Sequence, residues 1–199
     1  GTILGEEYTQ VFCSDFVLSK NKGDTVSTLS SSNALKDLTI SYGKKYYSTP
    51  VGEMNVVKKM KEVSSIVGGE GGGGIIYPEL HYGRDALVGI ALFLALLVDK
   101  KCKVSELKAQ YSEYFMKKIK ITLEDSKLID RSFKVIAENY SELSPNTEDG
   151  VRIDFEDAWV HMRKSNTEPI IRIFAEANSQ DIANRYALKI EKEIKSIGA

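Results

Sequence analysis

Two arginines and three small polar residues lie close together in the stretch HMRKSNTEPIIR, where two strand-like segments flank the polar letters RKSNTEP. Ser, Asn and Thr bond to their own backbone in turns, so a well-formed turn is one interpretation. The turn does not explain why a guanidinium stands at each end. Guanidinium groups with small polar side chains form a converging set of donors for a phosphate dianion. The predicted phosphate ligands are Arg163, Ser165, Asn166, Thr167 and Arg172.

A second candidate is the stretch VGGEGGGGII, in which Glu70 is the only charged residue among six glycines. The letters GEGGGG satisfy the GxGxxG pattern, but a dinucleotide site also needs a helix directly after the glycines. Here Ile75 and Ile76 follow, and they predict a strand instead. A flexible hairpin tip is one interpretation. The other is a loop in which Glu70 accepts hydrogen bonds from sugar hydroxyls, beside backbone that ligands can approach closely.

The elements around the glycines alternate between helices and short strands. This alternation predicts an α/β domain over residues 1–110, with three layers and a mixed, largely parallel sheet. The most apolar run, Ala86–Val98, is too short to span a bilayer, and we expect a fully buried core helix there. Helices are also expected over residues 6–20, 33–42, 50–63 and 104–111, with strands at 25–29, 65–69 and 75–77 and a turn and strand over 43–49.

The pattern changes near residue 111. The letters MKKIKITL alternate strictly between apolar and polar, which is typical of a half-buried strand. A helix over 126–140, a hairpin formed by VRIDF and AWVHM, a strand IIRIFAEA and a C-terminal amphipathic helix follow. Residues 111–199 therefore predict an α+β domain with an antiparallel sheet. The expected core face of the last helix carries Ala183, Ala187, Ile190, Ile194 and Ile197.

The composition of the 199 residues excludes several classes of protein. The formal net charge is −1, so no bulk positive field attracts nucleic acid or an anionic membrane. Cys13 and Cys102 are far apart in the sequence, and the two histidines do not cluster with them, so no zinc-binding pattern is present. The cysteine usage favours a reducing cytoplasm. We expect no metal ligands in this chain.

The motifs TPVGEMNVVKKM, GGEGGGG, GRDALVGIALFLALL and RKSNTEPIIR together resemble the α-D-phosphohexomutase superfamily, which includes the phosphoglucomutases and phosphomannomutases. The resemblance runs from Leu4 to Ile197. It implies that the first part is similar to the family's third domain, and the second to its fourth, TATA-box-binding-protein-like domain. It also implies that Glu70, with Gly72 and Gly74 of the same loop, contacts the sugar. Gly72 and Gly74 depart from the family, where Ser or Asn and then His are frequent.

The resemblance implies an isomerase that interconverts hexose 1-phosphate and hexose 6-phosphate, with a phosphoserine, magnesium and a hexose bisphosphate as intermediate or activator. The serine and magnesium loops of the family, in its first and second domains, have no match in this sequence. The chain is thus expected to be the C-terminal half of such an enzyme, with no catalytic residue and no turnover alone. Its partners would be those two domains of the same polypeptide and a hexose phosphate. The alternative is a stand-alone, non-catalytic sugar-phosphate-binding module.

Overall fold

The computed structural model describes residues 3–122, 126–165 and 170–197, and these residues form two compact units. The first unit is Gly1–Glu113 and the second is Tyr114–Ala199. The sequence predicts the division after residue 110, and the structure divides the chain after Glu113. The strand over residues 115–122 pairs in the second sheet and not in the first.

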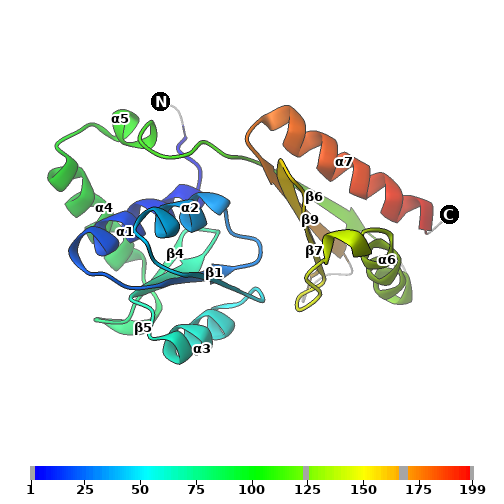
Figure 1. The fold of residues 1–199 in the computed structure, drawn as a ribbon, viewed down its shortest axis with the longest axis horizontal. Coiled ribbons are helices and arrows are strands. Elements are labelled where there is room, and N and C mark those ends of the chain that lie inside the picture. Colours follow the sequence, from blue (N-terminus) through cyan, green and yellow to red (C-terminus); the bar gives the residue numbers. More distant parts are fainter. Residues whose placement is uncertain (1–2, 123–125, 166–169, 198–199) are drawn as a thin grey trace. The chain divides into compact units, whose positions relative to one another are not determined.

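The first unit has three layers around a five-stranded sheet of order β2-β1-β3-β4-β5 (Figure 1). The strand β1 pairs in parallel with both β2 and β3, and β4 runs antiparallel to both of its neighbours. The strands are β1 (Thr25–Thr28), β2 (Tyr46–Thr49), β3 (Val67–Glu70), β4 (Gly74–Tyr77) and β5 (His81–Arg84). Four of the five strands were predicted; β5 was not.

Helices cover both faces of this sheet. One face packs against α1 and α4 through Cys13, Val17 and Leu92, and the other face packs against α3 through Val57 and Met60. The helices of the unit are α1 (Glu7–Lys20), α2 (Asn33–Ser41), α3 (Glu53–Val63), α4 (Ala86–Lys100) and α5 (Val104–Lys108). The expected α/β architecture with a mixed sheet, in which most strands point the same way, is confirmed.

One helix differs from its expected environment. The sequence predicts that Ala86–Val98 is fully buried, but in α4 only Gly89, Leu92 and Leu96 are buried. Four large apolar residues of the same helix are exposed by more than half: Leu87, Ile90, Leu94 and Val98. The prediction was wrong because α4 packs on α1 and the sheet along one face only. Composition alone does not show that the opposite face lacks a neighbour.

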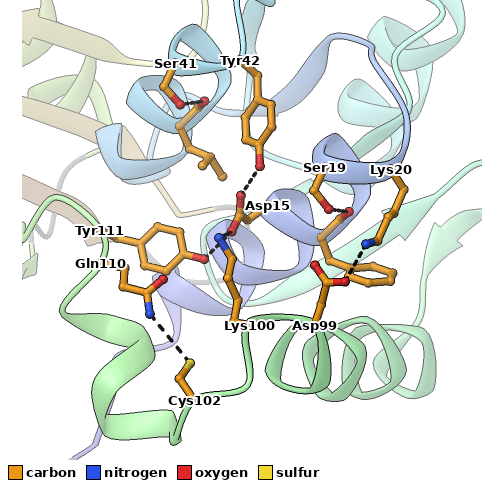
Figure 2. Close-up of polar contacts among 12 residues, drawn as sticks. Asp15, Ser19, Lys20, Ser41, Tyr42, Asp99, Lys100, Cys102, Gln110 and Tyr111 are labelled. Carbon is orange, nitrogen blue, oxygen red and sulfur yellow. Dashed lines mark hydrogen bonds and ion pairs between the residues drawn. The ribbon is translucent and has the colours of Figure 1, made fainter.

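A buried carboxylate fixes the end of the first unit to its first helix (Figure 2). Asp15 of α1 accepts hydrogen bonds from the hydroxyl groups of Tyr42 and Tyr111, both at 2.6 Å, and pairs with Lys100 Nζ at 3.1 Å. Burial, then the Asp15 carboxylate, raises the pKa of Tyr111. The Tyr8 hydroxyl also donates to the backbone oxygen of Ser112 at 2.7 Å. The segment that leads to the second unit is therefore anchored up to Ser112.

The second unit is a four-stranded antiparallel sheet of order β6-β9-β8-β7 with two helices on one face. Its core is mostly isoleucine, including Ile121, Ile171 and Ile173, packed against α6 and α7. Its elements are β6 (Phe115–Thr122), α6 (Ser126–Asn139), a short 3-10 helix (Ser141–Leu143), β7 (Val151–Asp154), β8 (Ala158–Lys164), β9 (Ile170–Ala177) and α7 (Gln180–Ile197). This arrangement confirms the predicted α+β class and the core face of α7.

Candidate functional site

The glycine loop lies at the edge of the first sheet where the parallel strands end. β3 ends at Glu70, residues 71–73 turn, and β4 begins at Gly74. The Gly73 amide donates to the Glu70 carbonyl at 3.0 Å, and the φ of Gly73 is +91°, a region that other residues rarely adopt. In open α/β sheets, ligands bind outside the carboxyl ends of the strands. The loop has the position of a binding site.

Glu70 is held by two partners within its own unit. Its Oε1 accepts a hydrogen bond from the Gly52 amide at 3.1 Å, and its Oε2 lies 2.8 Å from Arg84 Nη1. The side chain is 15% exposed. Glu70 is partly buried because the unpredicted strand β5 ends at the same edge and brings Arg84 there. Each carboxylate oxygen accepts more than one hydrogen bond, so Glu70 retains acceptor capacity.

Arg84 joins Glu70 to a second carboxylate, Glu53, in the first turn of α3. Arg84 Nε donates to Glu53 Oε2 at 2.9 Å, and the Arg84 backbone amide donates to Glu53 Oε1 at 3.0 Å. These two bonds, the backbone bond first, lower the pKa of Glu53. The hydrogen bond to Glu53 and the charge of Glu70 raise the pKa of Arg84. Glu53, Arg84 and Glu70 thus form a charged row across the strand ends.

Gly72 and Gly74, the two other residues of this loop that are predicted to contact the sugar, have different surroundings. A Cβ atom added to Gly72 would meet no atom within 4 Å, so Gly72 faces open space. A Cβ atom added to Gly74 would lie 2.5 Å from Arg84 Cδ, so the absence of a side chain there makes room for the arginine. Next to this loop in the sequence, His81 Nε2 lies 3.1 Å from Asp85 Oδ2, and Asp85 Oδ1 caps the N-terminus of α4.

Buried hydroxyl groups support the loop from behind. Ser27 Oγ donates to Gln10 Oε1 at 2.9 Å and lies 3.1 Å from the Gly69 carbonyl, directly before Glu70. Ser31 Oγ bonds Ser27 Oγ, and Ser32 caps α2 by accepting from the Ala34 amide. The sequence does not reveal the contact between Ser27 and Gly69, because the contact depends on how β1 and β3 pair.

The two predicted arginines of the second unit lie opposite each other. In the register of β8 and β9, Arg163 pairs with Arg172, and in the register of β9 and β6, Arg172 pairs with Lys120. Directly opposed residues on adjacent strands place their side chains on the same face. That face is opposite to the one with Met162, Ile171 and Ile173, which pack against the helices. Three cations therefore form a row across three strands.

Arg163 is less accessible than the sequence suggests. Its side chain is 14% exposed, and its Nε lies 3.5 Å from Asp149 Oδ2 without hydrogen-bond geometry. Ser165 is buried, and its amide donates to the Ile170 carbonyl at 3.0 Å, which closes the base of the loop. Asn166 and Thr167 lie outside the described residues. The structure thus brings Arg163, Ser165 and Arg172 together at one end of the strand pair.

A buried polar layer continues from Arg163 along the same face of the sheet. His161 is fully buried, and its Nε2 donates to the Asp149 carbonyl at 2.6 Å. Burial lowers the pKa of His161 to about 4, so the ring is neutral near pH 7. Further along, Trp159 Nε1 donates to Glu176 Oε1 at 2.8 Å. Sequence analysis missed this layer, although strict alternation in AWVHMR places Trp, His and Arg on one face.

The described residues contain no group of three or more His, Cys, Asp or Glu side chains placed to hold a metal ion. Within the same residues, no helix is both long enough and apolar enough to cross a membrane. Cys13 and Cys102 are both free thiols. The two sites above therefore consist of carboxylate, guanidinium, amine, hydroxyl and backbone groups.

Comparison with known protein families gives two consecutive matches. A model described as phosphoglucomutase/phosphomannomutase, alpha/beta/alpha domain III, matches residues 5–114, and one described as the C-terminal domain of the same family matches residues 100–193. Among solved structures, a phosphoglucomutase/phosphomannomutase family protein from Burkholderia thailandensis superimposes with a TM-score of 0.81 over 100% of this chain and 43% of that chain, at 21% identity. The structural likeness shows a shared fold.

Curated relatives are closer in sequence. A phosphoglucomutase/phosphomannomutase from Thermococcus kodakarensis is 36% identical over 188 residues, which are 94% of this chain and 41% of that protein. A phosphoglucosamine/phosphogalactosamine mutase from Sulfurisphaera tokodaii is 34% identical over 172 residues, 85% of this chain and 38% of that protein. The chain thus spans about two fifths of the length of these relatives. It belongs to the phosphoglucomutase/phosphomannomutase family, of which it contains domain III and the C-terminal domain.

Proposed function

We propose that this chain is the substrate-recognition half of a hexose-phosphate mutase that interconverts hexose 1-phosphate and hexose 6-phosphate. The glycine loop of the first unit recognises sugar hydroxyls, and the arginine row of the second unit recognises the phosphate that does not react. The observation that carries this proposal is the direct pairing of Arg163 with Arg172 beside Ser165. Guanidinium groups placed side by side, with a small polar side chain next to them, form a converging set of donors for a phosphate dianion.

The glycine loop of the first unit has groups that suit the hydroxyl groups of a sugar. Glu70 accepts hydrogen bonds, Gly72 leaves the adjacent space open, and Arg84 holds the carboxylate in place. A sugar diol needs acceptors for its hydroxyl hydrogens and room for its ring, and the loop provides both. The proposed sugar contacts are therefore Glu70 and the backbone at Gly72, whereas Gly74 contributes by making room for Arg84.

Phosphoryl transfer needs chemical groups that the described residues of this chain do not provide. Phosphoryl transfer depends on positioning and on neutralising charge at the transferred group. No described carboxylate cluster suits magnesium, so in our proposal the metal, which neutralises phosphate charge when bound, belongs to preceding domains of a longer polypeptide. An N-acetylphosphoglucosamine mutase from Aspergillus fumigatus, which shares the fold, is in complex with GlcNAc-6P and magnesium. A hexose bisphosphate is the proposed intermediate, and the two free thiols favour a cytoplasmic enzyme.

Calorimetric titration of the chain with glucose 1-phosphate tests the binding role. Charge-assisted hydrogen bonds contribute about 1.5–3 kcal/mol each, and association costs at least about 4 kcal/mol, so we expect a dissociation constant on the order of millimolar. A coupled mutase assay on the same sample should show no turnover, even with magnesium and a bisphosphorylated hexose. Turnover by the pure chain would contradict the assignment of catalysis to other domains.

A further inference from the structure

The turn that precedes β7 packs against the backbone of Arg163 in β8. Asn146 and Arg152 exchange two backbone hydrogen bonds of 2.8 Å each, and these bonds close the base of the turn. Gly150 has a φ of +75°, and a Cβ atom added to it would collide with the Met162 carbonyl oxygen and lie 2.9 Å from Arg163 Cα. Only glycine allows so close an approach. The turn therefore has a fixed position against the strand that carries Arg163.

Asp149, the residue before this glycine, is held through its backbone. Its carbonyl accepts a hydrogen bond of 2.6 Å from Nε2 of the buried His161. Burial lowers the pKa of His161, so a neutral ring with its hydrogen on Nε2 donates this bond near pH 7. The Asp149 side chain is 22% exposed, and its Oδ2 lies 3.5 Å from Arg163 Nε. The fixed backbone thus places the carboxylate at one edge of the guanidinium group.

A carboxylate in this place is unfavourable for an anion-binding site. Arg163 pairs in register with Arg172, and the Ser165 amide closes the loop beside them, which is the proposed phosphate site. A carboxylate beside a phosphate dianion repels it. By charge alone, Asp149 therefore lowers the affinity of the site for phosphate, and its presence there calls for a different explanation.

The geometry of the guanidinium group supplies that explanation. Its five N–H bonds lie in one plane at fixed angles, so a carboxylate at Nε also fixes where the two Nη groups point. Arg163 Nε is buried and has no hydrogen-bond partner in the part of the chain that the structure describes. We propose that Asp149 is a positioning residue, whose carboxylate holds the guanidinium plane of Arg163 so that both Nη groups face the phosphate. The inference rests on the proposed function, because that function supplies the phosphate.

Holding Arg163 in place strengthens binding by reducing an entropy cost. An arginine side chain that moves freely loses rotamer freedom when it binds an anion, and one that is already held loses less. In this account, the gain from orienting Arg163 exceeds the repulsion between Asp149 and the phosphate. The two effects have opposite signs, so removal of the carboxylate shows which of them is larger.

Titration of the 199-residue chain with inorganic phosphate at constant ionic strength, followed by NMR chemical shifts, measures the balance. Asp149→Ala should weaken phosphate binding about fivefold or more, although it removes a negative charge. The matched control is Glu148→Ala, which removes the same charge from the neighbouring, exposed position and should change the affinity by less than about twofold. Unchanged or tighter phosphate binding by Asp149→Ala would overturn the proposal, as would an equal loss in Glu148→Ala.

A second pair of variants separates orientation of the arginine from support of the turn. Lysine has no guanidinium plane to orient, so in an Arg163→Lys background Asp149→Ala should no longer weaken phosphate binding and should instead tighten it. The difference between the two backgrounds is the coupling between Asp149 and Arg163. If Asp149→Ala weakens binding by the same factor in both backgrounds, Asp149 only supports the turn and the proposal is wrong.

The NMR signal of the Arg163 Nε–H group reports the restraint without any ligand. It is assigned as the side-chain signal that disappears in Arg163→Lys. Exchange of this hydrogen with water should be slow in the wild type and in Glu148→Ala, and clearly faster in Asp149→Ala. A wild type that binds no phosphate would contradict the proposed function, whereas an Nε–H exchange rate that Asp149→Ala leaves unchanged would contradict the positioning role itself.

Discussion

The two candidate sites differ in the charges that they bring together. In the first unit, Arg84 is paired with both Glu70 and Glu53, so one guanidinium faces two carboxylates and the row is net negative. In the second unit, Lys120, Arg172 and Arg163 stand in register, with Asp149 3.5 Å from Arg163. A row with carboxylate acceptors suits neutral hydroxyl groups, and a row rich in cations suits an anion. The difference predicts which variants alter sugar recognition and which alter phosphate recognition.

The largest effect is expected from removing both arginines of the second unit. Arg163→Ala combined with Arg172→Ala should weaken binding of inorganic phosphate at least a hundredfold, because each charge-assisted contact contributes about 1.5–3 kcal/mol. Isothermal titration calorimetry measures the change. The control, Arg131→Ala with Arg185→Ala, removes the same charge from the two helices of the unit. Phosphate affinity that is unchanged in the first double variant, or equally reduced in the control, would remove the site.

The buried histidine beside Arg163 should make the second unit sensitive to acid. The pKa of His161 is about 4 in the folded protein and about 6.5 in an unfolded chain, so the unfolded state binds the proton first. The free energy of unfolding therefore falls as the pH drops from about 6.5 to 4, by up to about 3 kcal/mol, and stays level below that range. Urea unfolding of the wild type and of His161→Gln at pH 7, 5.5 and 4 measures this. A parallel pH dependence in both proteins would show that His161 does not cause it.

In the first unit, a change in the buried hydrogen-bond network around Asp15 should have a smaller effect on the free energy of unfolding. Tyr111→Phe removes one of three donors to Asp15, which costs about 1 kcal/mol in the free energy of unfolding. It should also release the segment before Ser112, which hydrogen exchange of residues 102–113 would detect. Tyr82→Phe is a suitable control because Tyr82 is exposed. Unchanged exchange in Tyr111→Phe would contradict the anchoring role.

The smallest effect is expected at Gly72. Gly72→Ser should change the free energy of unfolding by less than about 0.5 kcal/mol, because its added atoms meet open space. Gly74→Ser, two residues away, should displace Arg84 from Glu70 and weaken glucose 1-phosphate binding without altering phosphate binding. Thermal unfolding and calorimetry of the pair measure both effects. If Gly72→Ser and Gly74→Ser bind glucose 1-phosphate equally well, Gly74 does not have the role of making room for Arg84.

The sequence predicted those features that depend on periodicity and local motifs. Alternation in MKKIKITL located β6, and helical spacing located the core face of α7. It did not predict β5, because HYGR is short and polar, and therefore it missed the partner that reduces the exposure of Glu70. The register of Arg163 with Arg172 also could not be read from the letters, since it depends on how β8 and β9 pair.

Environment was harder to predict than secondary structure. The apolar run of α4 has the composition of a buried helix, yet Leu87 and Val98 are exposed because no element of the first unit covers them. Conversely, His161 and Asp15 are polar residues that the fold buries and satisfies with long-range partners. Such partners lie many positions away in the sequence. Only the folded structure shows which buried polar residues have such hydrogen-bond partners.

The central claim, that the first unit recognises hydroxyl groups and the second recognises phosphate, is tested most directly by one calorimetric comparison. Wild type and Glu70→Gln are each titrated with inorganic phosphate and with glucose 1-phosphate. We predict that wild type binds glucose 1-phosphate more tightly than phosphate, and that Glu70→Gln loses this difference while its phosphate affinity is unchanged. Equal affinities of the wild type for the two ligands, or an equal loss of both in Glu70→Gln, would contradict the claim.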